Sequence, residues 1–217
     1  MPKSSSDESV NDAIKKLRSE DVLTQNEGVQ ELITIGQPAA AELLLLLDDK
    51  SAGTRAQSMY ALSEIGTPKI AEAFKKGLRD EDERVRAYAA TGLARIGDPD
   101  ALAAAIQTLN DAPDEAHLDM TPSVSALGGM GLSAVGALLN LLMDDDENSR
   151  LHAQRALEMI IAGRHGFEVG KGFATSAAKE NAEAEWRANG NYNYGAPAAA
   201  RLAAEMKWRD WLRKQQL

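Results

Sequence analysis

Apolar positions recur along most of this chain at the spacing of an α-helix. In residues 80–111, apolar side chains from Val85 to Ile96 share one helical face. Gly97 follows at the point where a helix C-terminus favours a residue with a left-handed backbone. A second apolar stripe over residues 101–109 predicts another helix directly afterwards. The segment therefore predicts an antiparallel pair of helices.

The helix pair is repeated along the chain, and the copies align on the turn. The turn positions lie 30 to 34 residues apart, at Gly36, Gly66, Gly97, Gly131 and Ile161. Eight residues before each turn the side chain is always small, at Gly28, Ser58, Ala89, Ser123 and Ala153. A small residue lets two helix backbones approach closely. One helix pair cannot bury its apolar faces alone, so the copies must stack on one another.

This unit resembles the HEAT repeat, in the short-repeat subgroup of phycobilisome-lyase-like proteins. The resemblance covers residues 8–162, and the residues that carry it are Asp80, Asp82, Val85, Arg86, Ala89, Leu93, Ile96, Gly97 and Pro99. It implies an all-α, right-handed superhelix, a HEAT-like solenoid with helical caps. It also implies an Asp–Arg ladder between neighbouring repeats, which gives Arg55, Arg86 and Arg150 a structural role.

Three segments are expected along the chain. Residues 1–7 are predicted to be a disordered tail, and residues 8–162 form the repeat array with an N-terminal cap helix. Pro122 should shorten or kink the first helix of the fourth unit. Residues 163–217 begin with a glycine-rich connection and contain seven of the ten aromatic residues. This aromatic tail either caps the last repeat or supplies interface anchors such as Tyr192 and Tyr194.

Binding is expected on the face formed by the second helices of the repeats. Positions six and ten after each turn should point away from the stack, because positions four, eight and twelve carry the core stripe. Six of the predicted partner-binding residues occupy these positions, and Lys69 of the second unit is added to them. The full set is Glu42, Leu46, Lys69, Glu72, Lys76, Gln107 and Leu141. The leucines among them would be either partner contacts or core residues in a tightly curved array.

Composition narrows the function classes. The net charge of −9 argues against a nucleic-acid partner, including a DNA-repair role. The absence of cysteine excludes disulfides and thiol chemistry, and no apolar run is long enough to span a bilayer. A cytoplasmic protein with no membrane partner is therefore expected.

The sequence contains no clear motif for a catalytic, nucleotide or metal site. The glycine-rich run Gly166–Gly172 lacks the spacing of a phosphate-binding loop, and a flexible linker is the better interpretation. His117 with Asp114 and Asp119 lacks a metal-ligand pattern and is better interpreted as a solvated acidic loop. The predicted function is non-catalytic protein binding, without cofactor or metal. The alternative, a bilin lyase-like or small-molecule-binding helical-repeat protein, rests only on the resemblance.

Overall fold

The computed structural model describes residues 5–215, with side chains from residue 8. These residues form twelve α-helices and one two-stranded sheet, which confirms the expected all-α class of stacked helix pairs. They pack into two compact units, Met1–Ala104 and Ala105–Leu217, and each is described by itself. The division falls inside α7 (Ala101–Gln107). The sequence-based boundary after residue 162 stays a prediction.

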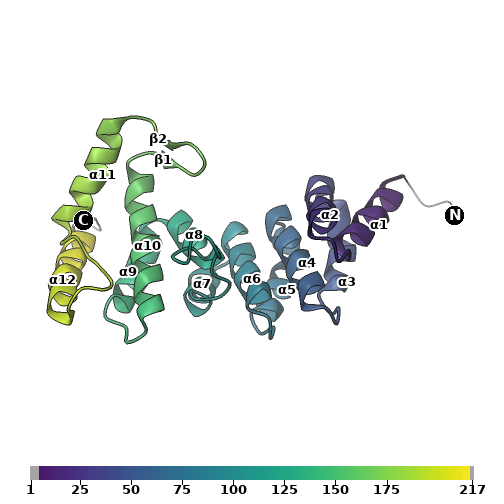
Figure 1. The fold of residues 1–217 in the computed structure, drawn as a ribbon, viewed down its shortest axis with the longest axis horizontal. Helices are drawn as coiled ribbons and strands as arrows, with labels where there is room; N and C mark the ends of the chain where they lie inside the picture. Colours follow the sequence, from purple (N-terminus) through teal and green to yellow (C-terminus); the bar gives the residue numbers. More distant parts are fainter. Residues whose placement is uncertain (1–4, 216–217) are drawn as a thin grey trace. The chain divides into compact units, whose positions relative to one another are not determined.

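Unit 1 consists of helix pairs in which the second helix is short. Its helices are α1 (Ser5–Leu17), α2 (Val22–Ile35), α3 (Ala40–Leu46), α4 (Ala52–Ile65), α5 (Ala71–Gly77), α6 (Glu83–Arg95) and the start of α7. Two 3-10 turns, η1 (Gln37–Ala39) and η2 (Pro68–Ile70), lead into α3 and α5. The first helices α2, α4 and α6 pack in sequence, while α3 packs on α4 and α5 on α6 (Figure 1). Each second helix therefore bridges to the first helix of the following repeat.

The N-terminal cap helix begins earlier than the sequence predicted. Helix α1 starts at Ser5, so the expected disorder is wrong for residues 5–7, and residues 1–4 lie outside the described residues. The helix packs on α2 and buries Val10, Ala13 and Leu17, whose exposed fractions are 4% or less. An apolar stripe at helical spacing that finds a partner is sufficient to order a chain terminus.

The small position before each turn is buried in all five units, as expected. A Cβ at Gly28 would lie 2.5 Å from the backbone nitrogen of Leu17, so only glycine fits between α1 and α2. The equivalent residues Ser58, Ala89, Ser123 and Ala153 are fully buried. The residues that the sequence alignment of the repeats places in equivalent positions therefore also pack in equivalent positions.

Unit 2 contains the end of α7, then α8 (Pro122–Met130), α9 (Leu132–Leu141), α10 (Glu147–Arg164), α11 (Ser176–Ala188) and α12 (Ala198–Gln215). Pro122 shortens the fourth unit as predicted, because α8 begins at this proline. Thr121 caps the helix: its Oγ1 accepts from the Val124 N–H at 3.0 Å and donates to the Leu109 carbonyl at 2.9 Å. The segment from the end of α7 to Thr121 is consequently a loop.

The fifth unit has no second helix. Helix α10 continues through Ile161 to Arg164, so the expected turn at Ile161 is absent. The glycine-rich connection then forms a hairpin of β1 (Phe167–Glu168) and β2 (Gly172–Phe173), with Phe167 opposite Phe173. Helix α11 packs on α10, and α12 packs on α9 (Figure 1).

Two aromatic residues of the tail are buried in unit 2. Trp208 is fully buried and contacts Trp186 and Trp211 edge-on, with ring centroids 5.2 Å apart in each pair. Tyr192 is 2% exposed, and its hydroxyl donates to the Leu142 carbonyl at 2.5 Å. Burial raises the pKa of this phenol above its ordinary value. Tyr192 is thus a packing residue within the chain and is not available as a surface anchor.

Candidate functional site

Most of the predicted binding residues of unit 1 lie on the surface. Glu42 on α3, Lys69 in η2, and Glu72 and Lys76 on α5 are exposed. The Lys76 ammonium lies 2.6 Å from an Asp48 carboxylate oxygen, which joins the C-terminal ends of α3 and α5. These second helices therefore present a surface of both charge signs.

Leu46 does not belong to this surface, and its predicted outward position is wrong. It is 6% exposed and shares the inward face of α3 with the fully buried Leu43, whereas Leu45 is 69% exposed. The reason is the turn before the helix. The 3-10 turn η1 starts one residue after Gly36, but η2 starts two residues after Gly66. Positions counted from the glycine are therefore shifted by one residue in the first repeat.

In unit 2, the two predicted binding residues differ in their exposure to solvent. Gln107 is exposed at the end of α7. Leu141 is only half-buried at the end of α9, between the buried Leu139 and Leu142. It therefore serves partly as core and offers little surface to a partner.

One rung of the Asp–Arg ladder implied by the resemblance, Arg55 with Asp80, is present in unit 1. The Arg55 guanidinium donates from Nε and Nη2 to the two oxygens of Asp80, both at 2.9 Å. Its Nη1 donates to the Asp49 carbonyl at 3.0 Å. The two side chains are 9% and 14% exposed. The ladder thus fastens the start of one repeat to the start of the next.

The same carbonyl contacts recur at the other ladder arginines. Arg86 Nη1 donates to the carbonyls of Asp80 and Glu81, each at 3.0 Å. Arg150 Nη1 donates to the carbonyls of Asp144 and Asp145 at 2.8 and 2.9 Å. Arg150 Nε donates to the Tyr194 carbonyl at 3.2 Å, so the tail supplies the acceptor where the array ends.

The ladder also shifts acid–base equilibria. Partial burial acts to raise the pKa of Asp80, but hydrogen bonds from Arg55 and from the Asp82 backbone outweigh it. The pKa of Asp80 is therefore held below its ordinary value of 3.8. The hydrogen bonds to Asp80 likewise raise the pKa of Arg55, which stays charged. This pair is structural, because all its polar atoms serve neighbouring backbone or side chains.

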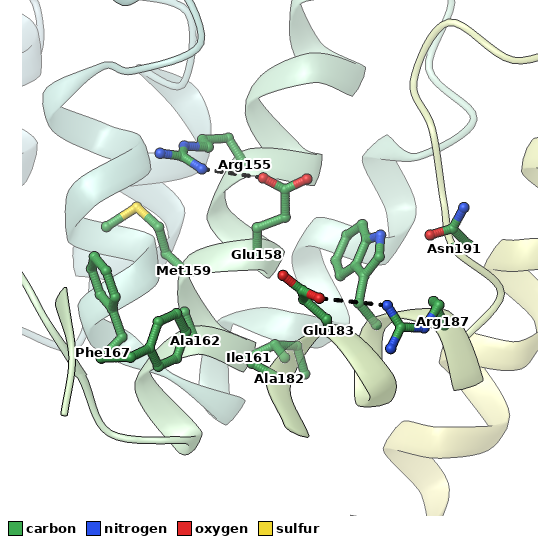
Figure 2. A pocket seen from close by; sticks show the side chains of 12 residues that line it. Arg155, Glu158, Met159, Ile161, Ala162, Phe167, Ala182, Glu183, Arg187 and Asn191 are labelled. Carbon is green, nitrogen blue, oxygen red and sulfur yellow. Dashed lines mark hydrogen bonds and ion pairs between the residues drawn. The ribbon is translucent and has the colours of Figure 1, made fainter. Parts of the chain in front are cut away.

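A pocket of about 490 Å³ lies in unit 2 between α10, the β1–β2 hairpin and α11 (Figure 2). Helix α10 contributes Met159, Ile161 and Ala162 to its apolar lining. The hairpin adds Phe167 and Phe173, and α11 adds Ala182 and Trp186. The two phenylalanines pack edge to face, with ring centroids 5.2 Å apart. Aromatic and aliphatic groups therefore form most of the wall.

The charged groups at this pocket neutralise one another. Arg155 lies 3.2 Å from a Glu158 carboxylate oxygen, and Arg187 lies 3.6 Å from Glu183 (Figure 2). Arg155 also lies 3.2 Å from Asp119. Asn191, at the pocket edge, is exposed and adopts φ +51°, a conformation uncommon for residues other than glycine. The sequence analysis did not identify this pocket, because its walls come together only through the packing of the tail.

The histidines have structural surroundings. His117 is exposed beside Asp114 at 3.5 Å, in the acidic loop expected from the sequence. His152 is 3% exposed and lies 2.7 Å from Asn110 Oδ1 and 2.9 Å from the Leu118 carbonyl, so it holds the loop before α8 against α10. Within residues 5–215, no group of three or more His, Asp or Glu side chains is arranged to hold a metal ion.

Among the described residues, no helix is both long enough and apolar enough to cross a membrane. The glycine-rich run forms β1, the hairpin turn and the first residue of β2 after a helix, which is unlike the strand–loop–helix context of a phosphate-binding loop.

Two solved structures show similarity to this chain. An engineered protein whose crystal structure was solved by a structural genomics consortium is 19% identical, with a TM-score of 0.43, covering 94% of this chain and 96% of that chain. A designed armadillo repeat protein is 17% identical, with a TM-score of 0.42, covering 94% and 99%. No curated protein matches the sequence.

The family comparison concerns the middle of the chain. The matching family model is described as HEAT repeats in general, and it lends no support to the phycobilisome-lyase-like subgroup. The match spans residues 41–117, from α3 to the loop before α8. Within these residues the chain is similar to HEAT repeats.

Proposed function

We propose that this chain is a non-catalytic interaction scaffold that binds a protein partner on the second-helix surface of unit 1. The observation that carries the proposal is the exposure of Leu45, 69% of whose surface is open to solvent. Leu45, in place of Leu46, is therefore the proposed apolar contact residue of α3.

The surroundings of Leu45 fit a protein partner. Glu42 precedes Leu45 by one helical turn and is exposed, and Asp48 follows by three residues in an exposed ion pair with Lys76. An apolar side chain with charged neighbours is the usual composition of an interface, in which an apolar centre is surrounded by a polar rim. Exposed ion pairs contribute little to the stability of the fold, about 0–1 kcal/mol, so Asp48 and Lys76 remain available to a partner.

Photo-crosslinking at single positions tests the proposal. We would replace Leu45 with p-benzoylphenylalanine and irradiate the full chain in lysate of its source cells. A discrete polypeptide adduct should form at this position. The adduct should be lost after charge reversal of the neighbours by Glu42→Lys and Lys76→Glu, because complementary charges fix the register of an interface.

Leu23 provides the matched control. It is 74% exposed and lies on the first helix α2, so the same crosslinker there samples a surface of similar exposure outside the proposed face. The same adducts from Leu23 and Leu45 would indicate non-specific capture. Absence of any adduct from Leu45 in cells that express the protein would contradict the proposal.

A further inference from the structure

The pocket between α10, the β1–β2 hairpin and α11 has the features of a small-molecule site. Its volume of about 490 Å³ falls within the range of roughly 300–1,000 Å³ typical of ligand pockets. Three separate elements line it, and all of them belong to unit 2. Because the pocket shares no residue with the second-helix surface of unit 1, a ligand bound in it is independent of the proposed function.

The aromatic side chains determine what the wall can contact. Phe167 is 37% exposed although it belongs to an aromatic pair with Phe173. Trp186 is half-buried and lines the pocket from the opposite element, α11. Rings prefer edge-to-face or offset contact with other rings, and the thioether of Met159 also packs well against an aromatic edge. A planar aromatic compound therefore complements this wall better than a branched polar one.

The charges determine what the pocket excludes. Arg155 and Arg187 are each paired with a glutamate that also lines the pocket. A charged ligand would have to break one of these pairs, and it would lose its own hydration without gaining an unpaired opposite charge. Among the described residues that line the pocket, Asn191 alone has a side-chain amide, which can donate and accept a hydrogen bond.

We propose that this pocket binds an uncharged, planar aromatic small molecule, with its rings between the hairpin phenylalanines and Trp186. A polar substituent of the ligand, such as a hydroxyl or amide, would face Asn191. The charged pairs Arg155–Glu158 and Glu183–Arg187 would stay intact and would disfavour an anionic analogue of the same shape.

The experiment uses two dyes that share their rings and differ in charge. N-phenylnaphthylamine is uncharged, and anilinonaphthalene sulfonate carries a sulfonate on the same ring system. Titration of the full chain should give saturable fluorescence enhancement with one site for the uncharged dye. The sulfonate should bind about tenfold more weakly, the factor equivalent to a difference of 1.4 kcal/mol.

Variants locate the binding site. Ala162→Trp should fill the pocket and weaken binding of N-phenylnaphthylamine by about tenfold or more, and Phe173→Ala should weaken it by up to about tenfold through loss of a ring contact. Leu202→Ala is the matched control, because Leu202 is a 48% exposed apolar residue on α12 that does not line the pocket. Each variant must show the thermal melting curve of the unmodified chain before its dye affinity is compared. If Ala162→Trp does not fold, the test rests on the dye affinity of Phe173→Ala.

Three results would overturn the proposal. The first is non-saturable binding of N-phenylnaphthylamine, and the second is equal affinity for the sulfonate. The third is unchanged binding by a folded Ala162→Trp or Phe173→Ala variant. Displacement of the dye only by an apolar peptide, and not by uncharged compounds such as naphthol, would assign the pocket to a protein partner and would likewise refute it.

Discussion

Asp80→Asn tests the ladder that joins the repeats of unit 1. The substitution keeps the shape of the side chain but removes the charge that faces Arg55. Arg55 would then be 9% exposed with one exposed carboxylate, Glu81 at 3.1 Å, and two backbone carbonyls as its remaining partners. The variant should still fold, because these partners prevent complete isolation of the guanidinium.

The expected magnitude lies between two limits. Exposed ion pairs contribute about 0–1 kcal/mol, and removal of one partner of a fully buried pair costs about 3–5 kcal/mol. With both oxygens bonded at 2.9 Å and the carboxylate 14% exposed, we expect a loss of about 2–3 kcal/mol in the free energy of unfolding. Asp48→Asn, at the exposed pair with Lys76, is the control and should cost at most about 1 kcal/mol.

Urea unfolding followed by circular dichroism measures both variants, and a double-mutant cycle with Arg55→Met isolates the pair. The pH dependence provides a second test. The folded-state pKa of Asp80 is lowered, so its contribution is present above the ordinary value of 3.8 that applies to the unfolded chain and is lost as pH falls through the folded value. The difference between unmodified chain and variant should therefore shrink in acid. Equal stability of the two at neutral pH, with zero coupling in the cycle, would refute the reasoning.

Three further predictions concern packing. Ala89→Leu should lower the free energy of unfolding by about 1–3 kcal/mol, because Ala89 is fully buried, and an unchanged urea midpoint would contradict the repeat register. Tyr192→Phe should cost about 1–2 kcal/mol in the same assay through the unpaired Leu142 carbonyl, and no cost would show that water replaces the hydroxyl. Truncation after Gly163 removes the tail helices that pack on α9 and α10, so light scattering should show aggregation; a monomeric fragment of equal stability would show that the tail is dispensable.

The repeat pattern was readable from the sequence because it depends on short-range geometry. Periodic apolar residues, a small residue eight positions before the turn and a glycine with positive φ all act within a few helical turns. Gly36, Gly66, Gly97 and Gly131 adopt φ between +60° and +73°. Pro122 likewise fixed the start of α8, since proline restricts its own backbone wherever it stands.

The outward orientation predicted for Leu46 is wrong, and the error has a local cause. Counting from the glycine assumes the same entry into every second helix. Gly36 and Gly66 share a positive φ but differ in ψ, −136° against 55°, so α3 starts in a different phase from α5. This difference of one residue buries Leu46 and exposes Leu45. The sequence contains no signal strong enough to distinguish the two glycine conformations.

The sequence by itself determined the helix pairs and their register, because each depends on neighbours within one or two repeats, whereas the ladder role of the arginines came from the family resemblance. The arrangement of the tail is visible only in the tertiary structure. Phe167 pairs with Phe173 in a hairpin, Tyr192 is buried against Leu142, and a pocket lies between α10 and α11. Tyr192 and Leu142 are 50 residues apart, and no periodic pattern relates them. Contacts of this kind follow from the way whole elements pack together, and that packing is not encoded in any local run of residues.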